Sequence, residues 1–239
     1  MIVREAGASL LLIRQTDHAA LSERIMAAWK PGDLVPAGIR ETVLLATREH
    51  DNGWIEVDAE PKRLRGTGRP FDFVNAPAAV KRGIWPRAVA RLGATRPDAA
   101  ALVAQHAITL FDGFREQDEW REFLTGLEQA RNELLDRGAR HVFGSMDAFL
   151  DAYRVVFLGD LLSLIFCCGW TRPFEEAGYR ITLRDDRLTI APDPFGGVEV
   201  ALSITARAIP VRRYGSDHEL QETVAAGELF ELAGTAVGE

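Results

Sequence analysis

Glu49-His50-Asp51-Asn52-Gly53-Trp54 places a histidine and an aspartate side by side at the end of an apolar helical run. We predict a helix over about residues 39–51, because apolar residues stand seven positions before both members of the pair. Glycine commonly ends a helix, so Gly53 is its predicted C-terminal stop. A buried imidazole beside a buried carboxylate needs a cation or a dense hydrogen-bond network. The pair is therefore a candidate metal site.

Three further predicted helices each carry one metal-competent side chain on their apolar stripe. The first is predicted to end at Pro31-Gly32, and the others run over about residues 98–111 and 146–168. One inward histidine is usually a satisfied core residue, but a buried carboxylate must be paired or coordinated. The coincidence across four helices predicts one metal centre. Its predicted ligands are His18, His50, Asp51, His106 and Asp160.

The apolar pattern changes from helical to alternating in the last third of the chain, and the N-terminus has the pattern of a hairpin. We therefore predict an α+β fold, predominantly α, in a single domain 1–239. Its helical core would span residues 16–168. Residues 1–14 and 178–210 would together form one antiparallel sheet packed against the helices.

Charge is unevenly distributed along the chain. Net charge is −7, which argues against general nucleic-acid binding. Residues 58–91 nevertheless carry eight Lys or Arg against three acids, a local +5 that would attract a small anionic substrate. A polar loop predicted over residues 55–76 is either a cover for an active site or a surface excursion. The acidic tail after Tyr214 predicts a short amphipathic helix around residues 220–230. The loop's candidate substrate-binding residues are Lys62, Arg65 and Arg69.

Composition and apolar runs favour a cytoplasmic protein. No apolar run approaches the length of a membrane span, and the N-terminus lacks the apolar stretch of a secretory signal. Cys167 and Cys168 are the only cysteines, and their apolar surroundings favour small core residues over a disulfide or metal pair. We expect no binding to membranes or nucleic acid.

The order of the predicted ligands resembles the HD-domain superfamily of metal-dependent phosphohydrolases. In that superfamily a first histidine, a His-Asp pair and a late aspartate bind the metal within a helical bundle. The matching residues here are His18, His50-Asp51 and Asp160, and Gly53 stands where the superfamily usually has glycine. The resemblance covers residues 16–168 and implies an HD-like helical bundle, while it leaves the β segments unexplained.

Four segments together look like an uncharacterised bacterial family with an HD-like core. That resemblance spans most of the chain and implies a fold and a metal site, without an activity that could be transferred. His106 is similar to the extra histidines of superfamily members that bind a second metal. His141 is another candidate, although its neighbours are typical of an interhelical turn and favour a surface histidine. The four segments are Gln15-Thr-Asp-His18, His50-Asp-Asn-Gly-Trp54, Gly68-Arg-Pro-Phe-Asp-Phe73 and Asp160-Leu-Leu-Ser-Leu164.

The resemblance implies a metal-dependent hydrolase that cleaves a phosphate ester of a small metabolite or nucleotide. One or two divalent transition metal ions (Mn, Fe, Ni, Co or Zn) suit a mixed set of imidazoles and carboxylates. Asp51 would ligate the metal or bridge two ions, and His106 would be a second-metal ligand or a general acid. One alternative is an HD-like di-iron oxygenase, which a ligating His141 would support. Another is a non-catalytic metal- or ligand-binding protein, and the extra sheet leaves a homodimer open.

Overall fold

The computed structural model describes residues 1–30 and 35–239, which form helices and one sheet. The mixture confirms the predicted α+β class, in which helices predominate. The helices are α1 (Gln15–Ala27), α2 (Arg40–Glu49), α3 (Ile55–Ala59), α4 (Ala78–Gly93), α5 (Pro97–Phe111), α6 (Asp118–Leu134), α7 (Arg140–Phe143), α8 (Met146–Cys168) and α9 (Asp217–Ala226). The strands are β1 (Ile2–Ala6), β2 (Ser9–Ile13), β3 (Phe174–Glu176), β4 (Tyr179–Arg184), β5 (Arg187–Ala191), β6 (Val200–Pro210) and β7 (Glu228–Gly238).

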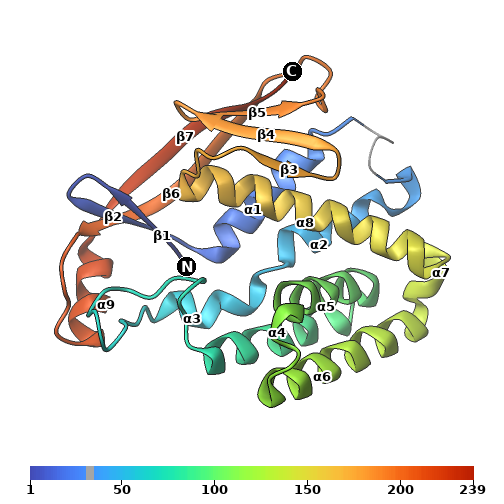
Figure 1. Cartoon of the computed structure of the whole chain (residues 1–239), viewed down its shortest axis with the longest axis horizontal. Helices are drawn as coiled ribbons and strands as arrows, with labels where there is room; N and C mark the ends of the chain where they lie inside the picture. The colour runs from blue at the N-terminus through green and yellow to red at the C-terminus, as the bar shows by residue number, and fades with distance from the viewer. Residues whose placement is uncertain (31–34) are drawn as a thin grey trace.

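The elements lie in layers. Figure 1 shows the sheet along one side of the molecule and α4, α5 and α6 along the other, with α1, α2 and α8 between them. A single apolar cluster contains residues from the sheet, such as Leu202, and from the central helices, such as Leu21 and Leu158. α9 covers the opposite face of the sheet at β1, β2 and β6 through a second cluster that includes Leu220. The central helices are therefore buried on both sides, and four of the five predicted ligands lie on them or directly after α2, while His106 lies on α5.

α8 is the longest helix and passes through the centre of the molecule. The Ser145 hydroxyl caps its start by accepting a hydrogen bond from the Ala148 N–H at 3.1 Å. Gly169 ends it in the left-handed conformation, with φ of 69°. Within residues 1–30 and 35–239, none of the helices combines the length and apolar character needed to span a membrane.

The sheet differs from the antiparallel sheet that the sequence predicts. Its strand order is β1-β2-β6-β7-β5-β4-β3, and β7 runs parallel to β5 while every other pair is antiparallel. β7 was not predicted, because residues 228–238 lack the alternation of a strand with one buried face. The predicted tail helix is confirmed as α9, but it ends at Ala226. The chain then returns as β7 to fill the space between β5 and β6.

Gly234 explains how β7 fits that space. A Cβ atom at this position would lie 2.1 Å from the carbonyl oxygen of Asp186, in the turn that joins β4 to β5. The Thr235 N–H donates to the same carbonyl oxygen at 3.1 Å. Only glycine allows the backbones to approach this closely.

Two predicted boundaries also change. Residues 55–76 are not entirely loop, because Ile55–Ala59 form α3. α1 ends at Ala27, and the predicted stop at Pro31-Gly32 lies outside the described residues.

Candidate metal centre

His50 and Asp51 lie where α2 ends. His50 keeps helical dihedral angles, whereas Asp51 leaves them with φ of −107° and ψ of 15°. His50 Nδ1 donates to the Thr47 carbonyl oxygen at 2.7 Å, and a carbonyl can only accept, so Nδ1 carries the proton. In a neutral ring this leaves the Nε2 lone pair free for a proton or a metal ion.

Gly53 is required by packing and does not act as a helix stop. It lies in a 3₁₀ turn, Asn52–Trp54, and a Cβ atom there would lie 2.1 Å from the Ile84 carbonyl oxygen in α4. Arg87 Nη2 donates to the Gly53 carbonyl oxygen at 3.1 Å, and Arg91 donates to that of Asn52. Two of the basic residues counted in the sequence therefore fix the turn that follows the His-Asp pair.

His18 from α1 joins the pair across the helix interface. Its Nε2 lies 2.8 Å from Asp51 Oδ2, and its Nδ1 lies 2.8 Å from the Ser163 hydroxyl in α8. Ser163 in turn lies 2.7 Å from the Ser22 hydroxyl and donates to the Asp160 carbonyl oxygen at 3.0 Å. The serines follow His18 and Asp160 by four and three residues, so each lies on the same helix face as its ligand.

Asp160 from α8 and His106 from α5 complete the cluster. Asp160 Oδ1 lies 3.3 Å from His50 Nε2 and 3.8 Å from His18 Nε2, and its Oδ2 lies 3.6 Å from His106 Nε2. His50 is central, with its ring centroid 5.1 Å from that of His18 and 5.0 Å from that of His106. Asp51 Oδ2 lies 3.6 Å from His50 Nε2. All five predicted ligands thus converge at one place.

The five side chains are closed off from solvent. None is more than 6% exposed, and the buried His50 Nε2 has no hydrogen-bond partner. Two overlapping triads could each hold a metal ion, because the donor atoms within each triad lie within 4.8 Å of one another. Imidazole nitrogens and carboxylate oxygens are ligands of divalent transition metals, so the donor set fits such an ion. The triads are His18, His50 and Asp51, and His50, His106 and Asp160.

The two carboxylates govern protonation in the cluster. Burial alone would lower the pKa of His50, but the charges of Asp51 and Asp160 outweigh it and raise that pKa to about 9. Burial alone would raise the pKa of Asp160, but the His50 ring 3.3 Å from its Oδ1 and the other nearby imidazoles outweigh burial and lower that pKa to about 2. Burial dominates at His106 and lowers its pKa to about 4. A proton on His50, or a cation in its place, therefore balances the carboxylates.

Gln15 and Asp58 extend the polar network toward the N-terminal hairpin, and the predicted ligand set omits both. Gln15 Nε2 donates to Asp51 Oδ2 at 3.0 Å, and Asp58 Oδ2 accepts from the Gln15 backbone N–H at 2.7 Å. Gln15 and Ser163 belong to segments that carried the family resemblance. Their orienting roles have no local signal, because their partners lie 36 and 145 residues away in the chain.

The predicted substrate-binding residues lie apart from the cluster in the described contacts. Arg69 pairs with Glu5 in β1, and its loop is held by a 2.8 Å hydrogen bond from the Tyr214 N–H to the Gly68 carbonyl oxygen. Arg65 is exposed, and Lys62 borders a surface pocket. The loop therefore packs on the hairpin and on the segment before α9. Substrate binding by these residues stays a prediction.

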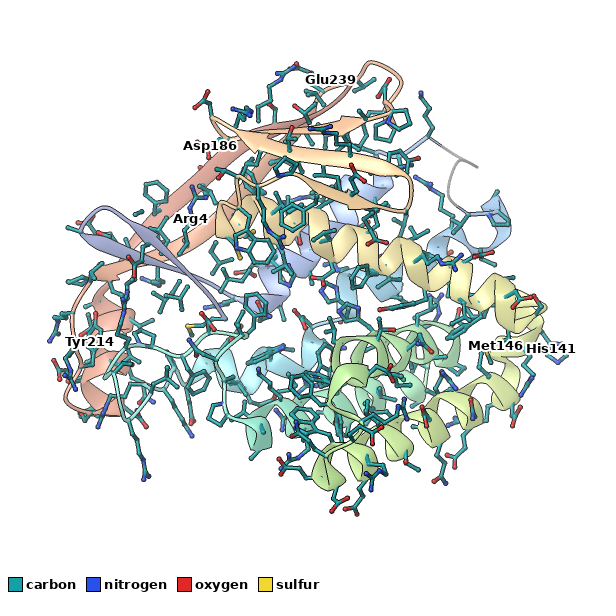
Figure 2. The ribbon with its side chains drawn as sticks, viewed as in Figure 1. Arg4, His141, Met146, Asp186, Tyr214 and Glu239 are labelled. Carbon is teal, nitrogen blue, oxygen red and sulfur yellow. The ribbon has the colours of Figure 1, made fainter. Side chains whose placement is uncertain are left out.

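The remaining two histidines do not join the cluster. His141 is exposed on α7 and points outward at the right-hand edge of Figure 2. His218 is exposed on α9, where it faces Glu222. This agrees with the expectation that His141 is a surface residue.

Comparisons with known proteins place the chain in one family. Comparison with curated proteins and with solved structures found no match, so the likeness to the HD-domain fold stays a prediction. Residues 1–211, which include all five candidate ligands, match a family described as "Protein of unknown function (DUF3891)". Because this match covers most of the chain, the protein belongs to the DUF3891 family.

Proposed function

We propose that the protein is a metal-dependent hydrolase that cleaves a phosphate ester of a small metabolite or nucleotide. The observation that carries this proposal is the orientation of His18 and His50. Each ring has Nδ1 paired outside the cluster, with Ser163 or Thr47, and Nε2 turned toward the carboxylates. Histidines that ligate metals are held in this way by their second nitrogen.

The spacing of the donor atoms around His50 fits a cation, whereas His18 Nε2 and Asp51 Oδ2 lie at a hydrogen-bond distance of 2.8 Å. Ligands about 2.0–2.2 Å from a tetrahedral ion lie about 3.3–3.6 Å from one another. Three contacts in the cluster span 3.3–3.6 Å: His50 Nε2 to Asp160, His50 Nε2 to Asp51, and His106 Nε2 to Asp160. Good N–H···O hydrogen bonds are shorter, at about 2.7–3.2 Å. Because His50 Nδ1 is engaged by Thr47, both triads share one free nitrogen, which favours a single ion.

The proposed chemistry follows from the residues of the cluster. A divalent ion held by His50 with Asp51 and Asp160 would supply Lewis acidity and would make a water nucleophilic near neutral pH. Asp51 and Asp160 provide the negative charge that retains the ion, and the closed surroundings strengthen that attraction. Burial keeps His106, at the edge of the cluster, neutral near pH 7, so its role in proton transfer would be to accept a proton. The choice of a phosphate ester rests on the resemblance to HD-domain phosphohydrolases.

Metal analysis tests the proposal. Protein purified without chelator is expected to contain about one transition metal ion per chain, and the Asp51→Asn variant is expected to lose it. Asp98→Asn is the matched control, because Asp98 is a buried aspartate outside the cluster. A panel of phosphate esters with added Mn²⁺ or Ni²⁺ should show turnover by the wild type and by the control only. Wild-type protein without metal, or activity that survives in Asp51→Asn, would contradict the proposal.

A metal-binding protein without turnover is the second candidate. In the part of the chain that the structure describes, the five side chains of the cluster are at most 6% exposed. A site this closed favours a structural or sensing metal. Bound metal together with no turnover across the panel would support this second candidate. The di-iron oxygenase loses its main support, because His141 is exposed on α7.

A further inference from the structure

Three buried polar atoms around His106 have no hydrogen-bond partner within residues 1–30 and 35–239. They are His106 Nδ1, the indole Nε1 of Trp85 and the hydroxyl of Tyr153. The ring centroid of Trp85, from α4, lies 5.6 Å from that of His106, and that of Tyr153, from α8, lies 6.1 Å from it. All three side chains are at most 6% exposed. Three helices thus place side chains with unpaired polar atoms next to one another at His106.

These groups are unusual because folding normally pairs buried donors and acceptors. A buried group without a partner loses its hydrogen bonds to water and gains nothing in return, so its presence suggests an unseen ligand or water. The other imidazoles of the cluster behave differently. His18 Nδ1 pairs with Ser163, and His50 Nδ1 pairs with Thr47. Of the three imidazole Nδ1 atoms of the cluster, that of His106 is the one without a hydrogen-bond partner among the described residues.

The chemistry of the three groups restricts the ligand. The Trp85 indole N–H can only donate, and the Tyr153 hydroxyl can donate, so both suit an acceptor oxygen. Aromatic rings line the rest of this side, with Phe157 6.4 Å from His106 and Phe111 6.2 Å from Trp85. These neutral donors lie in apolar surroundings next to a cluster that suits a cation. An oxyanion could therefore contact both the donors and the cation.

We propose that Trp85 and Tyr153 form an oxyanion subsite beside His106 and donate hydrogen bonds to a phosphoryl oxygen of the substrate. The subsite rests on the proposed function, because the ion of the cluster would hold another oxygen of the same group. Trp85 and Tyr153 then contact the substrate and select for a tetrahedral oxyanion.

Binding of inorganic phosphate to the metal-loaded protein tests the subsite by calorimetry. Tyr153→Phe removes only the hydroxyl and is expected to weaken phosphate binding about 3- to 10-fold, the effect of one lost hydrogen bond. Trp85→Phe is expected to weaken it similarly. Tyr179→Phe is the matched control, because Tyr179 lies on β4, where its hydroxyl accepts from Trp29. The control should bind phosphate as the wild type does.

Stability separates a substrate contact from a structural role. The Tyr153 hydroxyl approaches Thr109 without forming a geometrically complete hydrogen bond, so Tyr153→Phe should leave the metal content unchanged and should not lower the melting temperature of the metal-free protein. A lowered melting temperature, an unchanged phosphate affinity, or no phosphate binding by the wild type would overturn the subsite. Weaker phosphate binding by Tyr153→Phe without turnover of any ester would retain the subsite and remove the hydrolase. Turnover of an ester, together with phosphate binding that Tyr153→Phe leaves unchanged, would retain the hydrolase and remove the subsite.

Discussion

Hydrogen bonds behind His18 and His50 decide which nitrogen each ring presents to the cluster. Ser163 receives three such contacts at once, since its hydroxyl lies against His18 Nδ1, the Ser22 hydroxyl and the Asp160 carbonyl oxygen. It links the orientation of a histidine on α1 to the backbone of the helix that carries Asp160. Contacts of this kind fix the tautomer of a ligand and raise its basicity.

Ser163→Ala is therefore expected to weaken metal binding about 10- to 100-fold, because His18 loses the partner that orients its ring. Competition with a chromogenic chelator measures the affinity. Ser203→Ala is the control, since Ser203 is an exposed residue of β6 whose hydroxyl donates to Glu231. The metal affinity of this variant should equal that of the wild type. Equal affinities for all three proteins would show that Ser163 does not orient the ligand.

Close packing of three helices brings the ligands within range of one another. Gly159 in α8 faces Met26 of α1 and Thr47 of α2, where a Cβ atom would lie 2.8 Å from Met26 Cγ and 2.9 Å from Thr47 Cγ2. It precedes Asp160 directly, so α8 packs closely against α1 and α2 next to a predicted ligand.

Gly159→Ala should lower the free energy of unfolding by about 1–3 kcal/mol, because the added methyl group overpacks this interface. Gly126→Ala is a matched control on the exposed face of α6, where a Cβ atom would meet nothing within 4 Å. That change should instead stabilise the protein by up to about 1 kcal/mol, since alanine favours helix over glycine. Urea denaturation of both variants measures the difference, and a neutral or stabilising Gly159→Ala would contradict the packing argument.

The first turn of α5 is tied to α2 by a second, separate network. Asp98 Oδ2 accepts from the Thr42 hydroxyl at 2.7 Å and from Arg96 Nη2 at 3.0 Å. Burial alone would raise the pKa of Asp98, but the hydrogen bonds from Arg96 and Thr42 outweigh it and hold the pKa below its ordinary value. The carboxylate also lies near the positive end of the helix dipole.

A lowered folded-state pKa means that Asp98 stabilises the protein above the pKa of the unfolded chain. This stabilisation is lost as pH falls through the lower folded-state pKa. Asp98→Asn should therefore cost about 1–2 kcal/mol of unfolding free energy at pH 7. The difference in unfolding free energy from the wild type should shrink as pH falls below 3.8, the ordinary pKa of an aspartate. Denaturation at pH 7 and pH 3 measures it, and an equal difference at both would be inconsistent with this coupling.

At the scale of the whole molecule, the cluster joins parts of the chain that are far apart. Its ligands run from His18 to Asp160 and come from α1, the end of α2, α5 and α8. α1 and α8 pack against the sheet, whereas α5 packs against α4 and α6 (Figure 1). A metal ion at this point would therefore cross-link the two sides of the molecule.

Removal of the metal should lower the melting temperature. A ligand that binds only the folded state stabilises it by about 2.7 kcal/mol when the free ligand concentration is 100 times the dissociation constant. For a chain of this size that corresponds to about 5–11 °C. Calorimetry with and without chelator measures the shift. Asp51→Asn should show the lower melting temperature in both conditions, and a wild type that is insensitive to chelator would argue against a bound ion.

The sequence by itself determined the features that depend on local periodicity. His18, His106 and Asp160 were recognised because each stands on the apolar stripe of its own helix, and a stripe is a property of neighbouring residues. The same reasoning predicted the α+β class and the helix in the acidic tail.

Tertiary structure alone decided what depends on contacts between distant segments. Gly53 is needed because α4 approaches it, and β7 is a central strand because β5 and β6 leave a space for it. Arg69 pairs with Glu5, although its position in the chain suggested a place over the site. The physical reason is the same in each case. Helical stripes follow from the geometry of one turn, whereas pairing, close approach and unpaired polar groups depend on where the folded chain brings two segments together.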